Sequence, residues 1–347
     1  MDQPKVTYIH EDKLRQWCDL ALSVTDMSSE YRNIITDLLV STNMRGVDTH
    51  GINLLPSYVE RYTTLPHRPV TIVEDKKATA LLDGGDQLGA VSSVQAMDMA
   101  VRKAKEYGIG VVYVRNSSHF GAAAYYGLQA AKENCIGFAT TTAMVNLAPW
   151  GGIDEIAGKN PFALAFPGKE FPIVLDICCS VAARQKVIAC AREGKPIPLG
   201  WALDQEGKPT TDPNEALKGV FLPMAEHKGI GIAMMIEFCT ACICKTGYSY
   251  QVVTDGSRPQ NISHMFVAID PSFFVDLGEM KEESEKFSQK FHACRKMDGV
   301  EEIYLPGELE WKTYLRRREE GIPLKAALVK ELDDFAEKVN IRKIFDR

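Results

Sequence analysis

Short strands and helices are mixed along this 347-residue chain without alternating strictly, and this limits the folds open to it. Strand patterns at residues 79–82 and 111–114 flank a helical pattern at residues 92–107. A doubly wound sheet would require regular alternation, and its dinucleotide-binding form carries G-x-G-x-x-G after a strand. No such run follows a strand here, and no G-x-x-x-x-G-K-[ST] loop occurs. The pattern therefore argues against a Rossmann fold.

The charge balance and the apolar runs argue against two kinds of partner. A net charge of -6 disfavours a nucleic-acid binder, which should carry a basic surplus. The longest apolar stretch, residues 229–244, contains Glu237 and is shorter than the ~20 residues that span a bilayer. The N-terminal segment MDQPKVTYIHEDKLRQ is charged rather than apolar, and the nine cysteines have no secretory context. We therefore expect a cytoplasmic protein with reduced thiols and no membrane partner.

His119 is the first candidate for chemistry. It follows the apolar strand pattern of residues 111–114, in the loop N-S-S-H-F-G. Polar loops that follow buried strands commonly carry catalytic groups, and an ordinary histidine with a pKa near ~6.5 exchanges protons at neutral pH. The alternative interpretation is a loop histidine held by backbone hydrogen bonds.

Two further positions indicate anion binding at helix starts. His50 lies in D-T-H-G, where backbone N–H groups would favour an anionic ligand, although Asp48 and Thr49 would also suit a plain helix cap. Lys228 is followed by Gly229 and an apolar helical run, which suits a phosphate or a carboxylate. The alternative for Lys228 is a solvated loop lysine.

The cysteine pattern does not predict a metal site. Cys239, Cys242 and Cys244 lie inside an apolar helical run, where cysteine behaves as a small hydrophobic residue. No second cluster completes four zinc ligands. Nucleophilic hydrolysis also has little support, because no G-x-S-x-G elbow is present.

Several motifs occur in a defined order over most of the chain. They are RGVDTHGINLLPSYVERY, NSSHFGAAAYYG, APWGG, GKNPFALAFP, VLDICCS, IPLGWALDQEGKPTTDP, HKGIGIAMMIE and LPGE. In this order they resemble the type-2 malate/L-lactate dehydrogenase family, which also includes L-sulfolactate and ureidoglycolate dehydrogenases and related keto-acid and cyclic-imine reductases. The resemblance implies an α+β fold that is not a Rossmann fold, with a mostly antiparallel cofactor-binding sheet and helical parts built from both chain ends.

The resemblance also implies how the chain is divided. Residues 1–75 with 310–347 would form the helical part, residues 76–118 a connecting and dimerisation segment, and residues 119–309 the cofactor-binding mixed-sheet domain. The family is typically homodimeric, with active sites near the subunit interface, so we expect a homodimer.

Individual roles follow from the same resemblance. His119 would transfer the proton, and His50 would hold the substrate oxygen or carboxylate. Apart from the roles that the resemblance implies, we expect Arg45 and Tyr58 to contribute to substrate binding. The residues expected at the cofactor are Asp176, Ile177, Cys178, Cys179, Ser180, Lys228 and Asn160.

Three departures from the family pattern concern ligand contacts. Leu54 stands where members often carry an arginine, four residues after the S/T-H-G histidine, which suits a substrate carboxylate; Arg45 or Lys159 would have to compensate. The Met-Ala-Thr segment reads Ile177-Cys178-Cys179, which removes a hydroxyl contact to the cofactor. The G-T-N-P motif reads G-K-N-P.

The sequence therefore predicts a dehydrogenase that moves a hydride between NAD, with NADP as the alternative, and a small 2-hydroxy acid, most readily malate. It predicts no metal. One alternative is a reductase of a cyclic imine or diketo acid on the same scaffold, and another is a non-catalytic binding protein that kept the fold.

Overall fold

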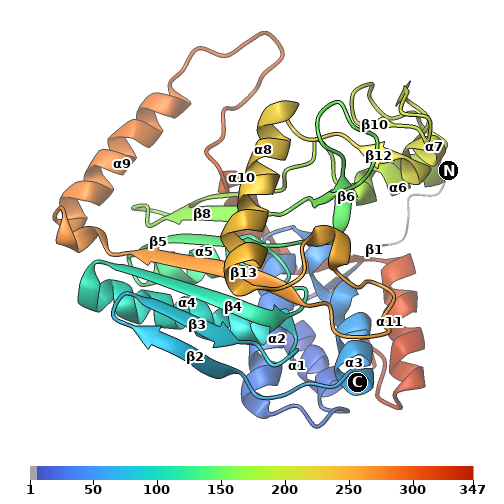
Figure 1. Cartoon of the computed structure of the whole chain (residues 1–347), viewed down its shortest axis with the longest axis horizontal. Coiled ribbons are helices and arrows are strands. Elements are labelled where there is room, and N and C mark those ends of the chain that lie inside the picture. The colour runs from blue at the N-terminus through green and yellow to red at the C-terminus, as the bar shows by residue number, and fades with distance from the viewer. Residues whose placement is uncertain (1–5, 347) are drawn as a thin grey trace.

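A seven-stranded sheet forms the centre of the computed structural model, which describes residues 6–346 (Figure 1). Its strand order is β2-β3-β4-β13-β5-β8-β9. The strands are β2 (Thr71–Lys76), β3 (Thr79–Asp83), β4 (Ile109–Ser117), β5 (Ile136–Thr141), β8 (Phe162–Phe166), β9 (Ile173–Ile177) and β13 (Ile262–Ile269). Every neighbouring pair is antiparallel except β3 and β4. The mixed helix and sheet content agrees with the predicted α+β class.

One face of this sheet is covered by α4 (Gly89–Tyr107) and α5 (Ala123–Lys132). Side chains alternate along a strand, so Val112 and Val114 of β4 are buried against these helices. Tyr113 points to the opposite face and is only half-buried. The β3, α4 and β4 elements fall within residues 76–118, so the segment expected to connect domains supplies part of the central sheet.

Helices from both ends of the chain share one hydrophobic core. They are α1 (Glu11–Leu22), α2 (Ser29–Met44), α3 (Leu55–Thr64) and α11 (Ala326–Lys338), with α10 (Glu308–Glu320) packed on α2. Trp17, Leu38 and Leu332 are fully buried or nearly so within it. The short strands β1 (Val6–Ile9) and β14 (Ile322–Lys325) pair antiparallel and tie the two ends together.

A smaller five-stranded sheet lies beside the central one, with the order β11-β10-β12-β6-β7. Its strands are β6 (Val145–Leu147), β7 (Ala157–Gly158), β10 (Ala202–Leu203), β11 (Pro209–Thr210) and β12 (Val220–Phe221), accompanied by α6 (Arg184–Glu193) and α7 (Pro213–Lys218). The chain then enters α8 (His227–Glu237), which ends in a π-helical turn, Phe238–Cys242. The last helix to place, α9 (Leu277–His292), projects at the periphery (Figure 1).

None of the helices within residues 6–346 combines the length and the apolar character that crossing a bilayer requires. Over the same residues, no group of three or more histidine, cysteine, aspartate or glutamate side chains is arranged to hold a metal ion.

Candidate active site

The structure brings His119, His50 and Tyr58 together. His119 follows the end of β4, and its Nδ1 lies 2.9 Å from the hydroxyl of Tyr58 on α3. The imidazole of His50 stacks on that of His119, with ring centroids 5.8 Å apart and an interplanar angle of 24°. Three residues that the sequence singled out separately therefore form one cluster.

The protonation states of this cluster follow from its surroundings. Desolvation, with smaller contributions from His50 and the positive charge of Arg61, lowers the pKa of His119 to about 3. Burial also lowers the pKa of His50 and raises that of Tyr58. Both imidazoles are therefore neutral near pH 7, and the phenol keeps its proton.

The backbone around His119 is held by side chains from other elements. The N–H of His119 donates to Oε1 of Gln260 over 2.9 Å. The Ser118 hydroxyl accepts from the N–H of Gly89 and donates to the carbonyl of Gln87, each over 3.0 Å. Gly89 has no room for a side chain, since a Cβ there would lie 2.0 Å from the Ser118 carbonyl oxygen. The first turn of α4 therefore packs directly on the loop that carries His119.

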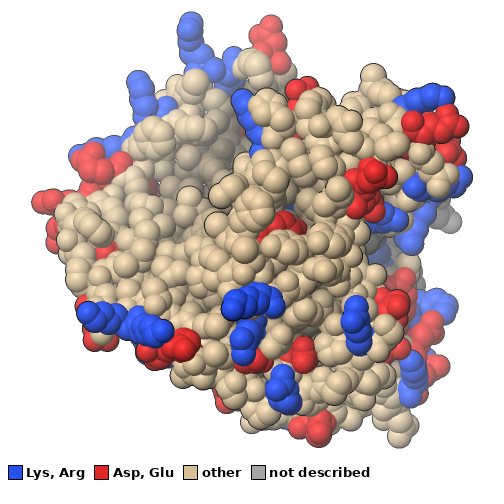
Figure 2. All heavy atoms as spheres, in the orientation of Figure 1, with Lys and Arg blue, Asp and Glu red and all other residues tan. Residues whose placement is uncertain are grey.

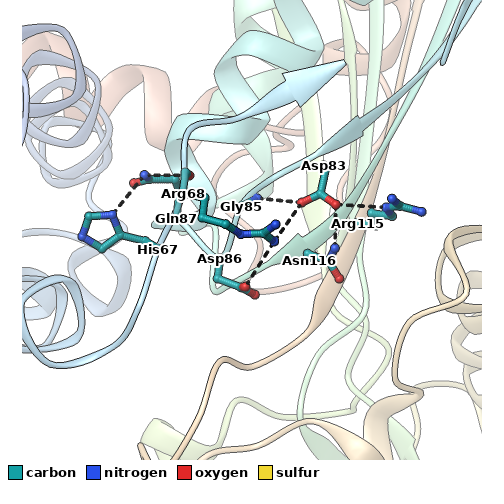
Figure 3. A network of polar contacts seen from close by, with 8 residues as sticks. All are labelled: His67, Arg68, Asp83, Gly85, Asp86, Gln87, Arg115 and Asn116. Atoms are coloured by element: carbon teal, nitrogen blue, oxygen red, sulfur yellow. Dashed lines mark hydrogen bonds and ion pairs between the residues drawn. The ribbon is translucent and has the colours of Figure 1, made fainter. Parts of the chain in front are cut away.

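An ionic network secures the end of β4 just before this loop (Figure 3). Asp83 accepts hydrogen bonds from Gly85 N–H at 3.0 Å, from Asn116 Nδ2 at 2.8 Å and from Arg115 Nε at 3.2 Å. Burial opposes ionisation of Asp83, but these bonds hold its pKa below the ordinary value. Arg68 adds a longer contact, 3.8 Å from Asp83.

The loop of His50 is fixed by a residue from the far end of the chain. Arg317 of α10 forms a two-pronged ion pair with Asp48, at 2.6 and 2.9 Å. Asn43 donates to Asp48 over 2.7 Å and accepts from the N–H of Ile52 over 2.7 Å. Gly51 must be glycine here, because a Cβ would lie 2.2 Å from Oδ1 of Asn43. No local signal in the sequence pointed to Arg317.

A second buried histidine that the sequence analysis missed supports the same region. His264 on β13 lies between Thr141, 2.7 Å from Nδ1, and Ser117, 2.8 Å from Nε2. Its ring stacks on Phe120 with centroids 4.9 Å apart. Burial lowers the pKa of His264 to about 3, so it packs in the neutral form.

Three segments near the expected cofactor site run side by side: residues 158–161, residues 177–180, and residues 223–224 just ahead of α8. The N–H of Cys179 donates to the carbonyl of Lys159 over 2.7 Å, and the Cys179 carbonyl accepts from Met224 over 2.8 Å. Ser180 bridges to Pro223, just ahead of α8. The Sγ of Cys178 lies 3.2 Å from the Ser180 hydroxyl, so these two side chains lie together just after the end of β9.

Lys228 stands exposed in the first turn of α8, at the rim of a groove of about 600 Å³ between α8 and the central sheet. The groove is mainly apolar, with Phe138 and Met265 among its lining residues. A helix N-terminus with an ammonium group beside it suits the phosphates of a dinucleotide, and the apolar wall suits a ring. The arrangement thus fits a nicotinamide cofactor.

Asp176 and Asn160 have structural contacts that the sequence did not predict. Asp176, near the end of β9 and one residue before Ile177, accepts from the N–H of Ala124 over 2.8 Å and so caps α5. Asn160 is fully buried, and its amide donates to Ala233 and Glu237 while its oxygen accepts from Ala143. The Asn160 side chain is therefore committed to the protein interior.

This chain resembles known proteins in sequence and in structure. It matches the family model of malate/L-lactate dehydrogenase over residues 9–333. It is 34% identical over 344 residues to a malate dehydrogenase of Pyrococcus horikoshii, covering 96% of each chain. It is 34% identical over 325 residues to a malate/(S)-sulfolactate dehydrogenase of Methanothermus fervidus, covering 92% of this chain and 94% of that one. A crystal structure of malate dehydrogenase from Entamoeba histolytica superimposes with a TM-score of 0.92 at 30% identity, over 97% of this chain and 99% of that one.

Proposed function

The chain belongs to the malate/L-lactate dehydrogenase family, and from this premise we propose that it oxidises and re-forms a small 2-hydroxy acid, with malate preferred. The family predicted from the ordered motifs is confirmed, and so is the predicted class of 2-hydroxy acid dehydrogenase. The preference for malate is supported by the relatives named for malate.

The contact between Tyr58 and His119 carries the proposed mechanism. In the tautomer that carries its proton on Nδ1, neutral His119 donates to the Tyr58 oxygen and leaves Nε2 free to accept the substrate hydroxyl proton. In the reverse direction the same nitrogen returns the proton to the carbonyl oxygen. The stacked ring of His50 would hold the substrate oxygen or carboxylate against His119. A bound nicotinamide ring supplies the hydride chemistry.

Cofactor binding is assigned to the segments that meet ahead of α8. We expect the backbone of residues 177–180 to line the nicotinamide nucleotide, and the Lys228 ammonium to bind a phosphate. Asp176 would contribute indirectly, because it caps the start of α5. Asn160 would act by holding the neighbouring backbone in place. NAD is proposed as the cofactor, and parallel fluorescence titrations with NADH and NADPH decide between the two.

Replacing His119 tests the proton-transfer role. His119→Ala should lower kcat by about 10²–10⁴-fold on every substrate that the wild type turns over, since general acid–base catalysis contributes that much. Thermal unfolding and NADH binding should stay close to wild type, which separates chemistry from folding. A variant with near-wild-type kcat would exclude His119 as the base.

The second candidate activity is the reduction of a cyclic imine or diketo acid. It is considered because Leu54 stands where relatives often carry an arginine that suits a substrate carboxylate. A substrate panel followed at the NADH absorbance band discriminates: malate, lactate, sulfolactate, ureidoglycolate and piperideine-carboxylate. The remaining alternative is a non-catalytic binding protein, which would turn over no substrate of this panel. Failure to bind either NADH or NADPH in a fluorescence titration would also favour it.

We also propose a homodimer. The face of the central sheet opposite α4 and α5 exposes apolar side chains, including Leu164 and Leu175. Figure 2 shows this face as a broad area with few charged side chains over the sheet and α8. Large exposed apolar areas mark contact surfaces. Sedimentation equilibrium should give the mass of two chains.

A further inference from the structure

The face of α3 that meets His119 carries more than Tyr58. Tyr58 and Arg61 are three residues apart and lie on one side of α3, and Leu54, the N-cap residue just before the helix, comes four residues ahead of Tyr58 on the same side. The Tyr58 hydroxyl bonds to His119, which shows that this side faces the imidazole. Side chains lean toward the N-terminus of their helix, so Arg61 reaches back toward the level of Tyr58. Its positive charge contributes to the lowered pKa of His119.

Arg61 has no anionic partner among residues 6–346. Arg15, Arg32 and Arg317 each form an ion pair with a carboxylate, whereas the half-buried Arg61 forms neither an ion pair nor a side-chain hydrogen bond within the described part of the chain. Burial lowers its pKa. A partly buried cation without a partner is unfavourable unless an anion joins it. The structure therefore holds a positive charge beside the reacting position.

The other two candidate cations face different groups. The charges that act on Arg45 are Glu310 and Asp176, both acidic. Lys159 lies 4.8 Å above the ring of Phe221. Neither Arg45 nor Lys159 contributes to the lowered pKa of His119, whereas Arg61 does.

We propose that Arg61 binds the carboxylate next to the reacting carbon of the 2-hydroxy acid, in place of the arginine that relatives often carry at the position of Leu54. Positions 54 and 61 are about 10 Å apart along the helix axis, at 1.5 Å per residue. The cation is thus moved two turns along the same face, with Tyr58 between the two positions. A planar guanidinium grips a carboxylate with two parallel hydrogen bonds, which orients the substrate as well as attracting it. This inference rests on the proposed dehydrogenase function.

Steady-state reduction of oxaloacetate by NADH tests the assignment in Arg61→Met. KM should rise by at least about 30-fold, the usual loss when one partner of a desolvated charge pair is removed, while kcat changes less. NADH affinity, measured by fluorescence, should not change. In the direction of malate oxidation, where neutral His119 accepts the proton, the acidic limb of the profile of kcat/KM against pH should move to higher pH, because a positive neighbour of His119 is gone.

Three further variants serve as controls. Arg102→Met removes an exposed arginine of α4 and should leave KM within twofold. Leu54→Arg combined with Arg61→Met restores a cation on the same face and should recover at least tenfold of the lost affinity. Arg61→Lys keeps the positive charge but loses the planar guanidinium that can form two parallel hydrogen bonds, so an intermediate KM is expected. This variant also keeps the test available if Arg61→Met proves unstable in thermal unfolding.

The possible outcomes distinguish failure of the Arg61 assignment from failure of the proposed dehydrogenase function. If the wild type reduces keto acids but Arg61→Met and Arg61→Lys both keep KM within threefold, Arg61 does not bind the carboxylate. If the wild type reduces no keto acid with either NADH or NADPH, the proposed function fails, and the assignment of Arg61 fails with it.

Discussion

The hydroxyl of Tyr58 lies 2.9 Å from Nδ1 of His119, and so links a helix of the N-terminal core to the strand end that carries the imidazole. Such a contact orients the imidazole ring and engages its Nδ1. In the proposed mechanism the other nitrogen, Nε2, exchanges the proton with the substrate.

Removal of this hydroxyl should impair chemistry more than binding. Tyr58→Phe is expected to lower kcat by about 10–100-fold with little change in KM, because removing a buried hydrogen-bond partner costs roughly 1–3 kcal/mol. Steady-state kinetics in both directions measure the effect. Tyr62→Phe on the same helix is the matched control, since the Tyr62 hydroxyl forms no hydrogen bond within residues 6–346. Equal kcat values for Tyr58→Phe and the wild type would show that the contact has no catalytic role.

The pair between Arg317 and Asp48 should couple α10 to the loop of His50. Arg317→Met leaves Asp48 without its two-pronged partner and should lower the free energy of unfolding by about 2 kcal/mol, discounted because Asp48 is 43% exposed. We also expect a several-fold loss of kcat/KM, since His50 loses its support. Urea unfolding and kinetics give the two values. The neighbouring Arg316 is exposed, and Arg316→Met should change neither; a matching loss in both variants would argue against a specific coupling.

The pKa of His264 predicts how stability depends on pH. The pKa of His264 in the folded protein, about 3, lies below the ordinary value of 6.5. Between these two pH values the unfolded chain binds a proton at His264 that the folded chain does not bind. The stabilising effect of the neutral ring is complete above pH 6.5 and is lost progressively as the pH falls toward 3. In this window His264 should contribute a slope of about 1.4 kcal/mol per pH unit.

The variant His264→Gln tests that slope rather than absolute stability. Urea unfolding at several pH values between 4 and 6 should show a free energy that falls less steeply with acid in the variant, by about one proton. His119 titrates in the same window, so it is kept unchanged in both proteins. An identical slope would mean that His264 is already protonated in the folded protein.

The sequence predicted those features that contiguous residues encode. The apolar run at residues 111–114 predicted a buried strand, and β4 spans that segment. The helical pattern up to Tyr107, ended by Gly108, corresponds to α4, although α4 begins three residues earlier than predicted because Ser118 caps its start from another segment. The pairing of β1 with β14 was missed, since a four-residue strand has no periodicity strong enough to recognise and its partner lies at the opposite end of the chain.

The sequence by itself determined the family, the α+β class and the kinds of side chain available for chemistry, because motifs of neighbouring residues carry that information. Only the tertiary structure decided which of those side chains meet. It placed Tyr58 on His119 and Arg317 on Asp48, enclosed Asn160 in the interior and left Arg61 without a partner among the described residues. These relationships depend on packing between segments far apart in the chain, where distance and desolvation, rather than sequence spacing, determine hydrogen bonds, ion pairs and pKa values.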